Sequence, residues 1–243
     1  MGARVRQGVN SVKRALLGAA ALFSAQAATA QNLVTNGDFS LGNTGFTSDY
    51  AYSPAGNDAA GQYAILTNPY PWNPFFVSIG DHTTGTGFMM VGNGSSTAGD
   101  VVWQSGPIAI TSGTDYFFEA FVANVCCNDT YGGGNSSPVL TFSVSLDGGP
   151  TNDLATLSIP LNPAGQWYGL STLFNSGAAT TATLSLVNAN TEPAGNDFAL
   201  DDVFLGTQSS VVPEPATWAM MLLGFGAIGL TSRRRKHVLS QAA

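Results

Sequence analysis

Basic residues are absent from the middle of this chain. Its 243 residues include eight Lys and Arg, four near each end, so residues 31–212 contain none. The same stretch carries 14 of the 15 carboxylates, which gives it a formal charge of about −14. Nucleic acids, anionic membrane surfaces and phosphorylated substrates are held by cationic side chains, so they are poor partners for this stretch. Neutral polymers and divalent cations are the partners that it favours.

Cysteine is also scarce, since Cys126 and Cys127 are the only two. Because they are adjacent, they cannot link distant strands, and the disulfide framework of many small secreted domains is missing. In an oxidising compartment the pair could form a vicinal disulfide, bond between chains or bind a soft metal. We favour the vicinal disulfide because no third cysteine competes.

Catalytic motifs are missing as well. His82 is the only histidine of residues 31–212, and neither a Gly-x-Ser-x-Gly elbow nor a zinc-ligand spacing occurs. Glu119 could be one of the two carboxylates that a glycosidase needs, but the sequence indicates no partner for it. We therefore expect a protein that is not an enzyme, with a glycan hydrolase as the alternative from another class.

Helical periodicity is absent between the two termini. Short runs rich in Val, Thr, Phe and Tyr alternate there with Gly, Asn, Pro and Asp, which is typical of strands and turns. Seven runs are predicted strands: 101–110, 116–125, 139–146, 154–159, 167–174, 182–188 and 198–205. The predicted fold is all-β, an antiparallel β-sandwich of the jelly-roll type, formed by one domain over residues 31–207.

The N-terminus has the features of a signal peptide over residues 1–30. Four basic residues precede the apolar run 15–23, and Ala28 and Ala30 are small residues of the kind that a signal peptidase requires. We expect cleavage after Ala30, and hence export.

The C-terminus has the features of a membrane anchor. Residues 208–215 form a linker that ends in Pro213, Glu214 and Pro215, and the prolines cannot continue into a helix. Residues 216–232 are predicted to form a transmembrane helix. Its uncharged core, 216–230, would extend about 22 Å, which is short for a hydrocarbon layer of about 30 Å. The basic residues of the tail 233–243 are expected to stay in the cytoplasm: Arg233, Arg234, Arg235 and Lys236.

This order of Pro-Glu-Pro, a short span with Gly224, Gly226 and Gly229, and terminal arginines resembles the PEP-CTERM sorting signal of Gram-negative bacteria. The resemblance implies processing by an exosortase, an inner-membrane protease that removes the tail and releases the protein outward. An ordinary single-pass anchor would explain the apolar run and the arginines but not the prolines.

Two other segments are similar to the first and last strands of jelly-roll carbohydrate-binding modules and galactose-binding-like domains. They are residues 32–40, with the sequence NLVTNGDFS, and residues 196–203, with the sequence NDFALDDV. The resemblance implies a structural calcium ion between these strands, with Asp38, Asp201 and Asp202 as candidate ligands. Ser40 departs from the family, which commonly has Glu at that position.

The charges of Asp201 and Asp202 need partners. As neighbours in one strand they are expected on opposite faces, so one of them points inward and requires a cation or backbone amides. The alternative to calcium is that the aspartates cap turns or accept hydrogen bonds from backbone N–H groups.

Sugar recognition is expected on a proline-rich loop, residues 68–76. Tyr70 and Trp72 could stack on sugar rings there, and Asn73 could bond a hydroxyl group. The alternative is a loop that folds its aromatic side chains back over the sandwich.

Taken together, these features predict an exported, exosortase-processed and non-catalytic protein of the cell surface or extracellular matrix. It would be anchored transiently in the inner membrane and would then bind or organise a neutral exopolysaccharide. A calcium-dependent adhesin or coat protein that assembles with itself is the alternative.

Overall fold

The computed structural model describes residues 30–57, 59–127, 136–192, 194–210 and 223–225. Residues Thr29–Pro213 are the first of two units of the chain and contain all of the described strands. In the first unit the described strands are β1 (Phe46–Thr47), β2 (Ala51–Tyr52), β3 (Gln62–Leu66), β4 (Met89–Asn93), β5 (Val101–Ser105), β6 (Ile108–Ala109), β7 (Asp115–Asn124), β8 (Val139–Leu146), β9 (Thr151–Ser158), β10 (Trp167–Asn175), β11 (Thr181–Asn188) and β12 (Phe198–Gly206).

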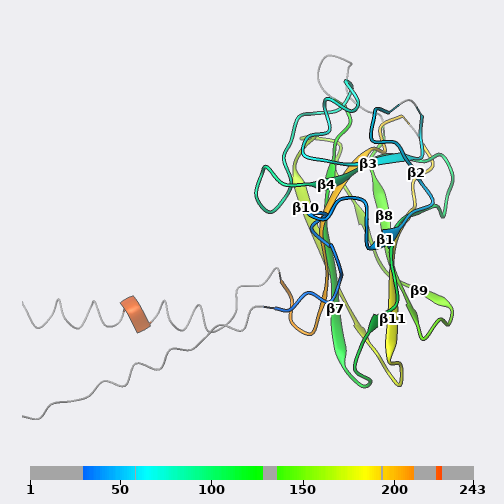
Figure 1. The fold of residues 1–243 in the computed structure, drawn as a ribbon, viewed down its shortest axis with the longest axis vertical. Coiled ribbons are helices and arrows are strands. Elements are labelled where there is room, and N and C mark those ends of the chain that lie inside the picture. Colours follow the sequence, from blue (N-terminus) through cyan, green and yellow to red (C-terminus); the bar gives the residue numbers. More distant parts are fainter. Residues whose placement is uncertain (1–29, 58, 128–135, 193, 211–222, 226–243) are drawn as a thin grey trace, which may run out of the picture. The chain divides into compact units, whose positions relative to one another are not determined.

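The strands form two sheets that pack face to face (Figure 1). The first sheet has the order β1-β5-β11-β8-β9, with β6 also paired to β11, and we call it sheet A. The second has the order β10-β7-β12-β4-β3-β2, and we call it sheet B. All of these pairings are antiparallel except that of β2 with β3. The predicted all-β sandwich is therefore confirmed.

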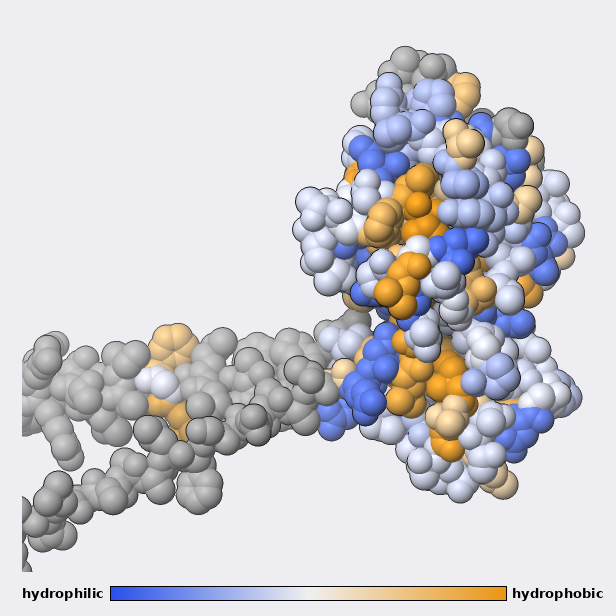
Figure 2. Space-filling view, viewed as in Figure 1, coloured by the Kyte–Doolittle hydropathy of each residue, from blue (hydrophilic) through white to orange (hydrophobic). Residues whose placement is uncertain are grey.

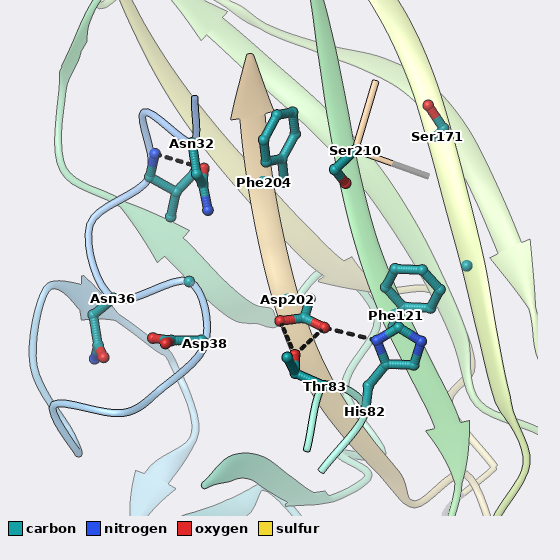
Figure 3. Close-up of a pocket in the computed structure, with 13 residues that line it drawn as sticks. Asn32, Asn36, Asp38, His82, Thr83, Phe121, Ser171, Asp202, Phe204 and Ser210 are labelled. Carbon is teal, nitrogen blue, oxygen red and sulfur yellow. Dashed lines mark hydrogen bonds and ion pairs between the residues drawn. The ribbon is translucent and has the colours of Figure 1, made fainter. Parts of the chain in front are cut away.

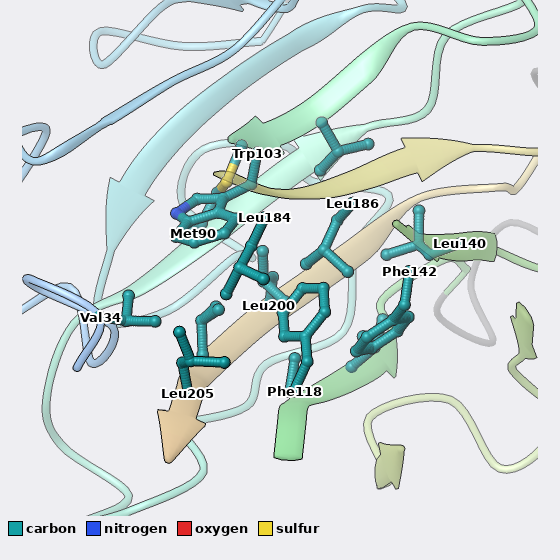
Figure 4. Close-up of a cluster of buried hydrophobic side chains, with 14 of the residues drawn as sticks. Val34, Met90, Trp103, Phe118, Leu140, Phe142, Leu184, Leu186, Leu200 and Leu205 are labelled. Atoms are coloured by element: carbon teal, nitrogen blue, oxygen red, sulfur yellow. The ribbon is translucent and has the colours of Figure 1, made fainter. Parts of the chain in front are cut away.

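The core lies between the sheets and follows the two-residue period of the strands. On β7, Phe118 and Val122 point inward and are fully buried, while Phe117 and Phe121 alternate with them and are only half-buried. Figure 4 shows side chains from both sheets meeting in this layer, with Phe118 of sheet B beside Phe142 of sheet A; their ring centroids are 4.9 Å apart. On the face seen in Figure 2, apolar side chains gather in patches between polar ones.

Six of the seven predicted strands are present within a few residues of their expected bounds. The seventh, 101–110, divides into β5 and β6 because Gly106 and Pro107 interrupt it. The strands β1 to β4 were not predicted. In β4 the apolar strand pattern is interrupted by Gly92. A larger residue does not fit there, because a Cβ atom would lie 2.4 Å from the ring of Phe198.

The segment 32–40, expected as an opening strand, consists of turns instead. It nevertheless lies along β12, as the resemblance implies. The Leu33 amide donates to the Leu205 carbonyl (2.8 Å), and the Val203 amide donates to the Gly37 carbonyl (2.9 Å). The side chain of Asn32 completes this pairing, because it donates to Val203 O and accepts from Leu205 N.

Several predicted features lie outside the described residues. These are the signal peptide up to residue 29, the Pro-Glu-Pro element, the basic tail and most of the span 216–232. Of that span, Leu223, Gly224 and Phe225 are described and are helical. Within the part of the chain that the structure describes, no helix has the length and apolar character needed to cross a bilayer.

Candidate functional site

The candidate site lies on the outer face of sheet B, the face turned away from the core. Two segments cover this face. The loop between β3 and β4 packs Trp72 and Phe76 on it and, further along, places His82 over Phe121. The residues that follow β12 lie over Glu119. A cavity lies between these segments on the outer face of sheet B.

Trp72 is buried rather than exposed, so the expectation that its ring is a free surface for sugars is wrong. Its Nε1 donates to the Ser53 carbonyl (2.7 Å), and the ring packs in an apolar cluster with Phe76. Asn73 is buried too and donates to the side chain of Asn57. The loop has folded back because Trp72 gains more by covering the apolar outer face than by facing water. Of the three candidate sugar-binding residues only Tyr70 is half exposed, and its sugar-binding role stays a prediction.

Asp201 and Asp202 lie on one side of β12, which corrects the expectation of opposite faces. The register of β12 against β7 shifts between Asp201 and Phe204, so one extra residue is accommodated there. Asp202 takes a positive φ of 48°, as expected of a residue in a β-bulge. Both aspartates consequently contact the same loop residue, His82.

His82 connects this bulge to the sheet. Its backbone N–H donates to Asp201 Oδ2 (2.9 Å), and its ring Nδ1 lies 2.7 Å from Asp202 Oδ2. The ring also stacks on Phe121, with centroids 3.6 Å apart and planes 15° apart. The Thr83 hydroxyl donates to the same Asp202 carboxylate. His82 is therefore held by Asp201, Asp202 and Phe121.

The electrostatics of the bulge are unusual because two carboxylates adjoin. Burial, and then the negative charge of Asp202, raise the pKa of Asp201 to about 7. Asp201 is 1% exposed, and its two oxygens accept from the N–H groups of His82 and Asp202. Two backbone amides thus donate to this carboxylate, as the alternative to calcium expects.

Asp38 lies across the cavity from these residues, on the N-terminal segment (Figure 3). It is exposed, and its Oδ1 accepts from the N–H and hydroxyl groups of Ser40. Across the described residues, no group of three or more His, Cys, Asp or Glu gathers in a way that could hold a metal ion. Calcium binding at Asp38, Asp201 and Asp202 remains a prediction.

The cavity on the outer face of sheet B has a volume of about 840 Å³, within the roughly 300–1,000 Å³ that is typical of ligand sites. Two phenyl rings, Phe121 and Phe204, line it together with His82. Amide and hydroxyl side chains, each already hydrogen-bonded within the protein, also line it: Asn32, Asn36, Thr83, Ser171 and Ser210. Figure 3 shows that these residues come from the N-terminal segment, from the loop between β3 and β4, from strands of sheet B and from the segment after β12.

Glu119 does not reach this cavity as a free carboxylate. It is fully buried, and both of its oxygens accept hydrogen bonds from serines. The arrangement is that of a structural carboxylate rather than of an exposed catalytic one.

Cys126 and Cys127 are joined to each other by a disulfide. They pack beside Phe76 in the apolar cluster that covers the other end of sheet B's outer face.

Sequence reasoning missed most of the residues that line the cavity. Phe121 and Ser171 have outward positions on strands that were predicted, so their shared face could have been noted. His82, Thr83 and Ser210 are brought to this face only by loops, and no local sequence pattern indicates that.

Residues 211–236 match the family model of the PEP-CTERM protein-sorting motif, which confirms the expected sorting signal. No curated protein matches the chain. Among solved structures it is similar to the CBM22-1-GH10 modules of xylanase 10B from Clostridium thermocellum, complexed with xylohexaose, at 18% identity and a TM-score of 0.47. That match covers 76% of this chain and 30% of the other, so the chain spans under a third of the xylanase structure.

Two isolated modules are also similar. One is TmCBM61 in complex with β-1,4-galactotriose, at 13% identity and a TM-score of 0.44, with 73% of this chain and 99% of that one covered. The other is the CBM22-1 xylan-binding domain of Paenibacillus barcinonensis Xyn10C, at 13% identity and a TM-score of 0.43, with 75% and 99% covered.

Proposed function

We propose that the chain is an exported, exosortase-processed protein of the cell surface or extracellular matrix, and that it binds a neutral exopolysaccharide without catalysing a reaction on it. The sorting motif supports export and processing. The cavity on the outer face of sheet B supports the binding function, and it is the observation that carries the proposal.

The chemistry of the cavity suits an uncharged, hydroxyl-rich ligand. Its phenyl and imidazole rings offer apolar contact to the C–H faces of sugars. The hydroxyls of Thr83, Ser171 and Ser210 donate to carboxylates of the protein, and their oxygens can still accept hydrogen bonds from sugar hydroxyls. Residues 31–212 contain no Lys or Arg, so an anionic polysaccharide would meet only carboxylates and one histidine. A neutral chain avoids this repulsion.

Affinity electrophoresis tests the proposal. The purified protein would be run through gels containing the exopolysaccharide of the producing cells, xylan or galactan, with polygalacturonate as the anionic comparison. We expect retardation by at least one neutral polymer and none by polygalacturonate. Retardation by polygalacturonate alone would contradict the proposal.

Two variants separate the cavity from the proline-rich loop. Phe121→Ala removes a ring from the cavity, and Tyr70→Ala removes an exposed ring of the loop. We expect Phe121→Ala to abolish retardation and Tyr70→Ala to retain it. The reverse result would move the sugar site to the loop. Concentration-dependent self-association without any retardation would favour the adhesin or coat protein.

A further inference from the structure

Glu119 is a buried carboxylate without a cationic partner. It lies in the middle of β7, is 0% exposed, and belongs to a stretch of the chain that contains no Lys or Arg. Burying an ionised carboxylate costs several kcal/mol unless hydrogen bonds compensate for the lost water. An apolar residue at this position would avoid that cost, so the hydrogen bonds of Glu119 deserve a structural explanation.

Those hydrogen bonds join two parts of the chain. From sheet B, the Ser171 hydroxyl donates to Oε1 (2.6 Å). The remaining donors belong to the segment Thr207–Ser210, which we call the C-terminal strap. The Ser210 amide donates to Oε2 (2.9 Å), and the hydroxyls of Ser209 and Ser210 donate to Oε1 and Oε2 respectively. Glu119 is therefore the attachment point of the strap on the sheet.

The attachment point adjoins the cavity. In the sheet, Glu119 is the direct cross-strand partner of Ser171 on β10 and of Phe204 on β12. Both partners line the cavity, and so does Ser210 of the strap itself. Figure 3 shows Ser210 facing the cavity from the side of β7 and β10. The strap thus supplies one wall, and a carboxylate behind that wall fixes its position.

We propose that Glu119 is a positioning residue of the glycan site, which holds the C-terminal strap in place so that Ser210 forms a wall of the cavity. This inference rests on the proposed function. The strap ends where the sorting motif begins, since that motif covers residues 211–236. Processing that removed Ser209 and Ser210 would open the cavity and expose Glu119. The inference therefore predicts that the cut falls beyond Ser210 and that the mature protein keeps the strap.

The first measurement does not depend on any glycan. Hydrogen exchange of the full chain reports on the Ser210 amide, which Glu119 protects. We expect Glu119→Ala to speed this exchange at least about tenfold, since a hydrogen bond to a charged group contributes about 1.5–3 kcal/mol. Glu119→Gln should keep the protection, because its amide can donate to the two hydroxyls at Oε1 while its oxygen accepts from the Ser210 amide. Equal exchange in wild type and Glu119→Ala would overturn the attachment.

The second measurement is the affinity for the neutral polymer that retards the wild-type protein best. We expect Glu119→Ala and the double variant Ser209→Ala/Ser210→Ala to weaken it at least about tenfold, and Glu119→Gln to stay within about threefold. The double variant leaves β7 unchanged, so it guards against misfolding of Glu119→Ala. Asp147→Ala is the control, because Asp147, in the turn after β8, also accepts hydrogen bonds from the backbone N–H groups of Thr180 and Thr181, where β11 of sheet A begins. It should change neither readout.

The outcomes separate this inference from the proposed function. Faster exchange with unchanged affinity would show a strap that is no part of the site, and would overturn the positioning role. If the wild-type protein binds no neutral polymer, the proposed function fails, while the exchange data still decide whether Glu119 holds the strap. Mass spectrometry of the processed protein should find a C-terminus at or after Ser210, and a shorter one would overturn the inference.

Discussion

The imidazole Nδ1 of His82 lies 2.7 Å from Asp202 Oδ2. His82 is the only side chain of residues 31–212 that can carry a positive charge. It lies where Asp201 and Asp202 of β12 face the same way, and its backbone N–H donates a hydrogen bond to Asp201. One residue therefore compensates both carboxylates and fastens a long loop to the central strands of sheet B.

Replacing His82 should loosen this loop. His82→Ala removes a charged hydrogen bond and a ring stack, and we expect the free energy of unfolding to fall by about 1–3 kcal/mol. His82→Phe keeps the stack on Phe121 but not the bond to Asp202. Its free energy of unfolding should therefore lie between those of the wild type and His82→Ala. Urea denaturation measures the differences. A His82→Ala protein as stable as the wild type would show that the contact contributes nothing.

Stability should fall as the pH rises from about 4 to 7. Burial, and then the charge of Asp202, raise the pKa of Asp201 to about 7 from an ordinary value of 3.8, and burial raises that of Asp197 to about 7 as well. Over this window the folded chain holds protons that the unfolded chain has released. The stabilisation is complete below pH 3.8 and is lost as the pH rises through 7.

Urea denaturation at pH 5 and pH 8 tests this dependence, since each pKa unit corresponds to about 1.4 kcal/mol. We expect the wild type to be more stable at pH 5. Asp201→Asn should show a smaller difference between the two pH values, because its amide does not titrate. An equally large difference in both proteins would assign the effect to other groups, such as the general repulsion among carboxylates.

The β-sandwich could be predicted from the sequence because its strands obey a local rule. In β8, Leu140, Phe142 and Val144 face the core at every second position, and no distant contact is needed to see the pattern. The position of residues 32–40 beside β12 could also be predicted, but only from a family resemblance. In both cases neighbouring residues carried the signal.

The site could not be predicted in this way because it depends on irregular backbone and distant contacts. One extra residue in β12 turns Asp201 and Asp202 to the same side, and nothing in the Leu-Asp-Asp-Val sequence indicates a bulge. Trp72 was expected on an exposed loop because the sequence shows the prolines around it. The apolar outer face of sheet B that it covers is formed by distant residues and cannot be read from the local sequence. The Glu119 attachment joins residues 91 positions apart.

A bound calcium ion would stabilise the sandwich. If calcium binds at Asp38, Asp201 and Asp202, a concentration 100 times the dissociation constant adds about 2.7 kcal/mol. We then expect the melting temperature to rise by roughly 5–10 °C in calcium relative to chelator, given about 2–4 °C per kcal/mol for a domain of this size. Asp201→Asn should remove the rise, and Asp147→Asn should retain it. Equal melting temperatures in calcium and chelator would mean that the amides at the bulge suffice.

Trp72 should matter for stability rather than directly for sugar contact. It is 5% exposed and packs against Phe76 on the outer face of sheet B, so Trp72→Ala leaves a large void and an unbonded Ser53 carbonyl. We expect a loss of about 3–5 kcal/mol in the free energy of unfolding. Tyr70→Ala, on the same loop but half exposed, should change it by less than about 0.5 kcal/mol. Urea denaturation of both variants decides between a packing role and a sugar-stacking role, because a Trp72→Ala protein of wild-type stability would mean that the ring does not hold the loop on the sheet.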